Sequence, residues 1–324
     1  MYTKKDLKDE IVITEQKVPC PVKDCDILVD RKRKTNNENK EFVCRKHRII
    51  ITPSTFIYQD IKDILVFQDD IKLLNEILGT KRESRLANEN SEDAVSWNVF
   101  RYLETEGQLL KWLNEITKET HSMFEIMYWS YCNKKKGTYP LLEKARDEFG
   151  VRPNQGSEPD IIIKTDKTLF FIEAKLFSSN KTSGTGKTIN NRKENNKQYE
   201  TGGNSLFKNI FASSYVEIIN DQKYELMRFW LLGYWMARQE GLNFQLINLV
   251  LERNEKEIEK GFGKHINQNN TSIFSRQTWE SLYHFINENG NKNQYHENIV
   301  SYFENKTAGY TSDGKLRDSA FDLS

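Results

Sequence analysis

The stretch PDIIIKTDKTLFFIEAK, residues 159–175, contains two apolar runs that are joined by the polar tetrapeptide TDKT. Short apolar runs on either side of a polar turn predict two antiparallel strands. If Asp166 and Lys167 form the loop, Thr165 faces Thr168. The same pairing, continued along both strands, then places Asp160 opposite Glu173.

Opposed residues of an antiparallel pair share one face, with Cβ atoms roughly 4.5–5.5 Å apart. Lys175 lies two residues beyond Glu173 and therefore shares this face. Two opposed carboxylates repel, so a positive charge is expected between them, either Lys175 or a divalent cation such as Mg²⁺. An exposed, charged hairpin is the simpler alternative. The run LFFIEAK is too apolar for an exposed edge, which favours an active site at the rim of a core.

Periodicity on either side predicts helices and strands around this hairpin. The order helix, strand, strand pair, helix, strand indicates an α/β fold with a mixed central sheet. The expected elements are a helical stretch from 92 to 116 that is capped by Ser91 and interrupted at Gly107, a strand within 123–132, helices within 205–219 and 224–240, a strand within 243–252, and two helices near Trp279 and Tyr302.

Pro159-Asp160, twelve intervening residues and then Glu173-Ala174-Lys175 resemble the PD-(D/E)xK motif of the restriction-endonuclease-like superfamily. The resemblance covers residues 92–252, about half of the chain. It implies an αβββαβ core and a metal-dependent nuclease. It also implies that Asp160, Glu173 and the Ala174 carbonyl bind Mg²⁺. Lys175 would then orient or deprotonate the attacking water.

The resemblance also suggests accessory residues. Some members add an acidic residue from the preceding helix, for which Glu92 is the candidate and Glu104 a rival. Others carry Gln and Tyr after the lysine, which points to Gln198 and Tyr199, although the spacing differs here.

Cys20, Cys25, Cys44 and His47 form two closely spaced pairs of metal ligands. Two such pairs across an intervening loop are typical of a structural Cys₃His zinc site. Basic residues surround them and are candidate phosphate contacts: Arg31, Lys32, Arg33, Lys34, Arg45, Lys46 and Arg48. The sequence leaves open whether this zinc module binds DNA or a protein.

Composition limits the class of protein. The chain has 324 residues, a net charge of +1 and 4 cysteines, which argues against a disulfide scaffold. The N-terminus lacks an apolar signal segment, and the longest apolar run, near Phe229, is too short to cross a bilayer. We therefore expect a cytoplasmic protein without a membrane partner. The expected organisation is a zinc module over 1–55, a helical connector over 56–90, a nuclease core over 91–254 and a helical extension over 255–324.

The function that these features predict is Mg²⁺-dependent endonucleolytic cleavage of DNA in restriction or defence. Double-stranded DNA is the expected substrate, and a homodimer would supply one active site for each strand. Two alternatives stay open. One is a non-catalytic, zinc-dependent nucleic-acid or protein-binding module on a nuclease-like scaffold, and the other is a nuclease of DNA repair or RNA processing.

Overall fold

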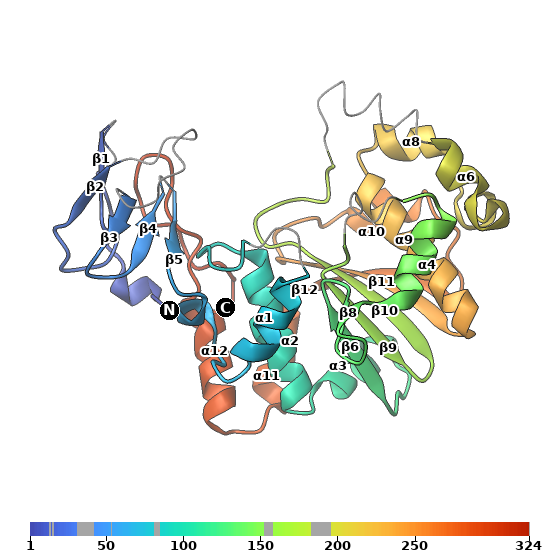
Figure 1. The fold of residues 1–324 in the computed structure, drawn as a ribbon, viewed down its shortest axis with the longest axis horizontal. Helices are drawn as coiled ribbons and strands as arrows, with labels where there is room; N and C mark the ends of the chain where they lie inside the picture. The colour runs from blue at the N-terminus through green and yellow to red at the C-terminus, as the bar shows by residue number, and fades with distance from the viewer. Residues whose placement is uncertain are drawn as a thin grey trace. The chain divides into compact units, whose positions relative to one another are not determined.

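The structure is a computed structural model that describes residues 1–12, 14, 16–30, 42–52, 54–80, 85–151, 158–182 and 196–323 (Figure 1). The chain divides into two compact units. The first comprises Met1–Asn75, Arg82–Leu109 and Leu282–Ser324, and the second comprises Glu76–Lys81 and Leu110–Ser281. The finer domain limits expected from the sequence stay predictions.

A mixed sheet organises the second unit. Among the described residues, seven strands pair in the order β12-β11-β10-β9-β6-β7-β8. The strand β9 is antiparallel to β6 and β10, whereas β10, β11 and β12 run parallel. The strands are β6 (Phe124–Tyr128), β7 (Tyr131–Cys132), β8 (Gly137–Thr138), β9 (Ile161–Thr165), β10 (Thr168–Ala174), β11 (Asn243–Val250) and β12 (Ser272–Thr278).

The hairpin of β9 and β10 has the register expected from the sequence. Lys164 pairs with Leu169, and the pairing continues to Ile161 and Ile172. The Thr165 hydroxyl closes the turn, because it donates to the Thr168 carbonyl and accepts from the Thr168 N–H, each at 2.9 Å. Every residue of β10 is buried, as expected for a central strand that is covered on both faces.

Helices complete the second unit. The order α3, β6, β9, β10, α9, β11 confirms the αβββαβ core, with β7, β8 and α4 inserted after β6. The helix α9 ends at Gly241, which takes the left-handed conformation with φ of 66°. The helices are α3 (Leu109–Thr117), α4 (Pro140–Glu148), α6 (Asn196–Ser205), α7 (Phe207–Ile210), α8 (Tyr215–Asn220), α9 (Tyr224–Glu240) and α10 (Ile258–Gly263). The helix α11 (Trp279–Asn289) begins in this unit and continues into the first.

One apolar core joins α4 and α9 to the sheet. Phe171, Leu246 and Phe274, on three neighbouring strands, belong to the same buried cluster as Trp230 of α9. Gly233 lets α9 approach the sheet closely, since a Cβ at this position would lie 2.1 Å from Cε2 of Phe244.

The first unit combines small sheets with helices. Among its described residues, β1 pairs with β2 in an antiparallel ribbon, and β3, β4 and β5 form an antiparallel meander. Its elements include β1 (Lys17–Pro19), β2 (Leu28–Asp30), β3 (Val43–Cys44), β4 (Ile49–Ile51), β5 (Phe56–Tyr58), α2 (Glu92–Thr105) and α12 (Gln294–Asn305), with 3-10 turns at Lys4–Asp6 and Ile61–Ile64. The helix α1 (Ile71–Leu78) crosses the limit between the units. As expected, Ser91 caps α2, accepting from the Ala94 N–H at 3.1 Å.

A buried ion pair closes the first unit. Lys306 donates to Glu89 Oε1 at 2.8 Å, and both side chains have 0% exposure. Thr307 donates to Oε1 at 3.0 Å and Tyr58 to Oε2 at 2.9 Å, so both carboxylate oxygens have partners. A buried ion pair offsets its desolvation only when its remaining polar atoms are hydrogen-bonded, as they are here.

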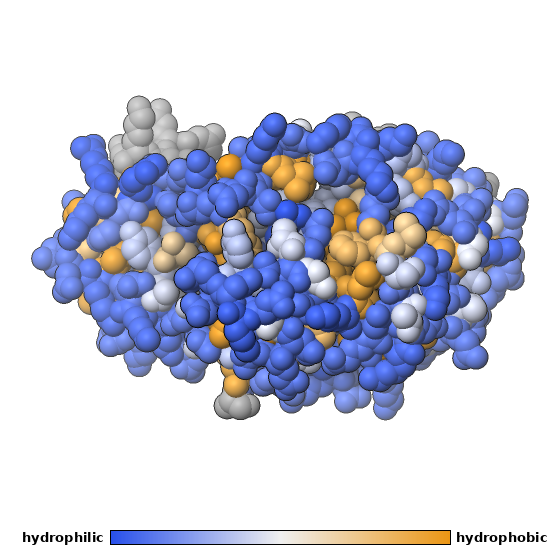
Figure 2. All heavy atoms as spheres, turned by 90° about the horizontal axis from the view of Figure 1, so that it is seen from below, coloured by the Kyte–Doolittle hydropathy of each residue, from blue (hydrophilic) through white to orange (hydrophobic). Residues whose placement is uncertain are grey.

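Polar and charged residues cover most of the face drawn in Figure 2, with hydrophobic residues in separate groups. Exposed large hydrophobic side chains include Val12, Leu28 and Met123.

Among the described residues, no helix combines the length and the hydropathy that a bilayer-spanning segment requires.

We expect Gly233→Ala to destabilise the protein by about 1–3 kcal/mol, because the added methyl group overpacks the contact between α9 and Phe244. Gly261→Ala is the matched control, since a Cβ there meets nothing within 4 Å and alanine favours the helix. Urea unfolding measures both. Equal stability of the two variants would contradict this account of the α9 contact.

Candidate functional site

Asp160 is held in place from two sides. It directly precedes β9, and its backbone carbonyl accepts a hydrogen bond from the Trp129 N–H at 2.9 Å. Its Oδ2 accepts from the Ala174 N–H at 2.8 Å, across the hairpin. Pro159 has no N–H to satisfy at this point. The carboxylate therefore lies beside the end of β10, where the register predicts it.

Glu173 lies near the end of β10 with 3% exposure. Its Oε1 accepts a very short hydrogen bond from Lys175 Nζ. Its Oε2 is buried and has no hydrogen-bond partner. Buried polar atoms are normally paired, so this carboxylate oxygen calls for a partner such as a water molecule or an ion.

The backbone of Lys175 is anchored on both sides. Its N–H donates to the Leu249 carbonyl at 2.8 Å, and its carbonyl accepts from Trp279 Nε1 at 3.2 Å. The side chain of Lys175 extends to Glu173, to which its Nζ donates. The Lys175 Nζ also lies 3.7 Å from Oε2 of Glu225, which comes from the first turn of α9.

Glu225 was not predicted from the sequence. The sequence gives little indication of a functional role for Glu225, because the helix dipole alone favours a glutamate in the first turn of a helix. The structure shows that the N-terminus of α9 lies at the carboxyl end of β10, and this brings Glu225 to Lys175.

Electrostatics couple these four residues. Burial raises the pKa of Glu173 well above its usual value, and the negative charges of Asp160 and Glu225 raise it further, whereas Lys175 opposes the shift. Burial alone would lower the pKa of Lys175, but Glu173, Asp160 and Glu225 raise it above its usual value. The lysine is therefore held as an ammonium among three carboxylates, a position that a metal cation could share or take over.

The structure brings Asp160, Glu173 and Lys175 together, as the sequence predicts. Glu92 and Glu104 lie in α2 of the first unit, where Glu104 forms an ion pair with Arg101 at 2.5 Å. Gln198 lies in α6 of the second unit. The catalytic roles suggested for Glu92 and Gln198 stay predictions.

Tyr199, the neighbour of Gln198, is nearly fully buried. Its hydroxyl lies 2.9 Å from that of Tyr224, which directly precedes Glu225. This contact packs α6 against the start of α9.

The predicted zinc ligands converge in the first unit. The ligand atoms of Cys20, Cys25, Cys44 and His47 all lie within 4.8 Å of one another. Among the described residues, this is the one group of three or more His, Cys, Asp or Glu side chains whose ligand atoms lie close enough together to hold a metal ion.

The spacing of the four ligands fits a tetrahedral zinc ion. Bond lengths of about 2.3 Å to sulfur and about 2.0–2.1 Å to nitrogen place neighbouring ligand atoms about 3.5–3.8 Å apart. The Sγ atoms of Cys25 and Cys44 lie 3.8 Å apart, and His47 Nδ1 lies 3.3 Å from Cys20 Sγ and 3.5 Å from Cys44 Sγ. Burial and the charges of Lys46 and Lys8 lower the pKa of His47, which favours the neutral imidazole that binds metals.

Two tight turns position these ligands. The Cys20 N–H donates to the Ile27 carbonyl at 2.9 Å, and the Arg48 N–H donates to the Cys44 carbonyl at 2.8 Å. Asp24 and Arg48 take positive φ values of 56° and 54°, which let each turn fold back toward the metal position.

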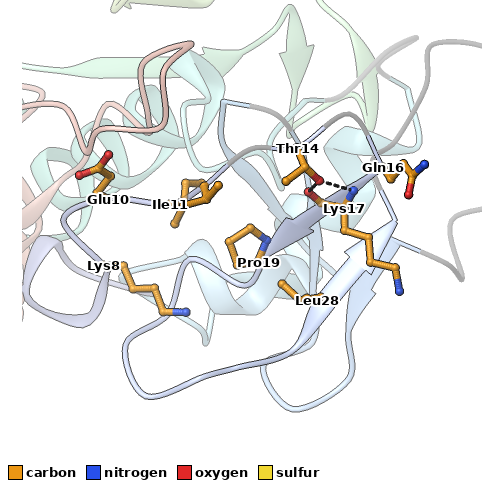
Figure 3. A pocket seen from close by; sticks show the side chains of 9 residues that line it. Lys8, Glu10, Ile11, Thr14, Gln16, Lys17, Pro19 and Leu28 are labelled. Atoms are coloured by element: carbon orange, nitrogen blue, oxygen red, sulfur yellow. Dashed lines mark hydrogen bonds between the residues drawn. The ribbon is translucent and has the colours of Figure 1, made fainter.

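A pocket of about 540 Å³ in the first unit is lined by residues that include Pro19, next to Cys20 (Figure 3). Apolar Val12 and Leu28 share the wall with Glu10 and Lys17. The wall is therefore mixed in character, unlike a phosphate-binding surface.

Exposed basic residues lie instead beside the cluster, at Arg45, Lys46 and Arg48. These are the better candidates for phosphate contacts. The other predicted contacts, Arg31, Lys32, Arg33 and Lys34, lie outside the described residues.

A family model described as "Restriction Endonuclease associating with ARP" matches residues 30–306. No curated protein matches the chain, and no solved structure matches it. The match spans the hairpin with Asp160, Glu173 and Lys175, and two of the four cluster ligands, Cys44 and His47.

We expect the purified chain to contain about one zinc ion, and Cys44→Ser to lose it, because a thiolate supplies much of the binding energy of such a site. Cys132→Ser is the matched control, since Cys132 is a buried thiol outside the cluster. Elemental analysis measures the zinc content. Full zinc retention by Cys44→Ser would rule out the assignment of this ligand.

The affinity of the Asp160–Glu173 site for Mn²⁺ or Mg²⁺ is expected to fall as the pH is lowered, and to do so at a higher pH than for an ordinary glutamate, because protons compete with the cation for a carboxylate of raised pKa. Below its raised pKa, Glu173 is protonated and cannot bind a cation, so acidification weakens binding. Calorimetry at a series of pH values measures the effect. An affinity that does not change with pH would contradict it.

Proposed function

The chain belongs to the family of restriction endonucleases associating with ARP, and on this premise we propose that it is a Mg²⁺-dependent endonuclease that hydrolyses phosphodiester bonds of double-stranded DNA in restriction or defence. The convergence of Asp160, Glu173 and Lys175 at the end of the central strands carries this proposal. It supports chemistry of the PD-(D/E)xK type.

The residues at this site fit a hard divalent cation. Carboxylate and carbonyl oxygens are the ligands that Mg²⁺ prefers. Asp160, Glu173 and the Ala174 carbonyl supply such oxygens, and the unpartnered Oε2 of Glu173 is available for an ion. When bound, the cation would supply Lewis-acid polarisation of the phosphate and neutralise its negative charge.

The role of Lys175 follows from its surroundings. Three carboxylates raise its pKa, so near neutral pH the side chain is an ammonium that donates hydrogen bonds and is a poor general base. An ammonium fixed at this position can orient the attacking water and stabilise the charge that develops on the phosphate oxygens. We therefore assign Lys175 an electrostatic and orienting role.

Glu225 gives Lys175 a second partner. If Oε1 of Glu173 also served a bound cation, Lys175 would lose its short hydrogen bond to that oxygen. The Glu225 carboxylate, 3.7 Å from Nζ, can then hold the ammonium near the site. The buried lysine would then have a carboxylate partner both with and without a bound cation. This limits the free-energy cost of breaking its hydrogen bond to Glu173.

The Cys₃His cluster takes a structural part in this proposal. A zinc ion with four protein ligands has no open position for catalysis. Its exposed neighbours Arg45, Lys46 and Arg48 would contact phosphates without reading bases. Cleavage of both strands would fit a homodimer, since one site cuts one strand.

We expect the purified chain to cleave plasmid DNA with Mg²⁺ and to lose this cleavage with EDTA. Asp160→Asn should reduce cleavage by about 100-fold or more, because it removes a charged ligand oxygen, and Lys175→Ala should act similarly through lost charge stabilisation. A gel assay of supercoiled, nicked and linear DNA measures the rates.

The matched controls are Asp147→Asn, on the exposed side of α4, and Lys167→Ala, at the tip of the β9–β10 hairpin. Both should retain the cleavage rate of the unaltered chain. Equal cleavage by Asp160→Asn, Lys175→Ala and the controls would refute the proposal.

A further inference from the structure

A polar residue of the neighbouring strand lies directly beside Glu173 in the sheet. Asn248 of β11 is its paired neighbour in the parallel register. Paired residues of adjacent strands point to the same face, with the strands about 4.7–4.9 Å apart. Asn248 is fully buried, and an amide at this depth in an apolar sheet requires hydrogen-bond partners.

The hydrogen bonds of Asn248 are incomplete. Asn180, in the segment after β10, donates from its side-chain amide to Asn248 Oδ1 at 2.8 Å, and Asn180 is also fully buried. The Asn248 Nδ2 and the Asn180 Oδ1 have no partner. With the amides oriented as in the structure, an unpaired donor lies in the strand next to the unpaired Oε2 of Glu173.

Further hydrogen bonds hold Asn180 in position. Its backbone N–H donates to Glu255 Oε1 at 3.2 Å. Arg276 braces the loop before Glu255, since its Nη2 donates to the carbonyls of Leu251, Glu252 and Asn254 at 3.2, 2.7 and 2.9 Å. The Asn254 amide in turn donates to the Leu176 carbonyl at 3.3 Å, which ties the loop back to the end of β10. A rigid frame therefore fixes the amide beside Glu173.

We propose that Asn248, oriented by Asn180, is a positioning residue that donates a hydrogen bond to Glu173 Oε2, directly or through one water molecule, and so holds this carboxylate in its cation-binding orientation. The proposal rests on the proposed function, because it concerns the same cation site. Residues that orient metal ligands in this way typically contribute 10–100-fold to metal affinity. Asn248 touches neither the cation nor the DNA in this account, and it acts through Glu173.

The test is cation binding by the full chain in the absence of DNA. We expect Asn248→Ala to weaken Mn²⁺ binding by about 10–100-fold in calorimetry while the protein stays folded. The exposed Asn270→Ala is the matched control and should bind as the unaltered chain does. A higher Mg²⁺ concentration should restore DNA cleavage by Asn248→Ala but not by Asp160→Asn, a difference that a purely structural role of Asn248 would not produce.

Unchanged Mn²⁺ affinity in folded Asn248→Ala overturns the positioning role alone. If this variant does not fold, Asn180→Ala decides, because it leaves Asn248 in place and removes its orienting partner. Weakened binding in Asn180→Ala supports the role, and unchanged binding overturns it. Absence of Mn²⁺ binding by the unaltered chain overturns the proposed cation site itself, and this inference with it.

Discussion

The register of the β9–β10 hairpin is the constraint on which the candidate active site depends. Side chains alternate between the two faces of a strand, so a slip of one residue would move Glu173 away from Asp160. The buried runs on both strands exclude such a slip, because it would reorganise packing on both faces of the sheet. The hydrogen bond from the Ala174 N–H to Asp160 then fastens the end of the hairpin where the charged groups meet. The core thus forces together carboxylates that would otherwise repel.

Local features of this protein could be predicted from its sequence. The hairpin register follows from the position of the polar turn. The end of α9 follows from Gly241, which takes a left-handed conformation that other residues adopt less readily. The convergence of the cysteines and the histidine follows from short turns within each ligand pair. In each case, the residues that decide the structure lie within a few positions of one another or in adjoining segments.

Other features depend on contacts between distant segments and were not predicted. Glu225 reaches Lys175 because α9 packs across the sheet, and Asn248 reaches Glu173 because β11 adds in parallel beside β10. The strand β12, Ser272–Thr278, was also missed. It lies at the edge of the sheet, and its polar residues give a weak strand signal. Contacts between distant segments depend on how the whole core packs, so no local sequence pattern predicts them.

The two ends of the chain meet in the first unit. The Leu316 N–H donates to the Asp9 carbonyl and the Ile11 N–H donates to the Gly314 carbonyl, each at 2.8 Å, while the Tyr310 hydroxyl donates to the Lys8 carbonyl at 2.9 Å. A ribosome releases the N-terminal segment first, and domains generally fold as they emerge. Here the contacts of residues 8–11 with residues 310–316 can form only after residue 316 has been synthesised. The strands of the second unit precede residue 316 in the chain, so its sheet can fold before these contacts of the first unit form.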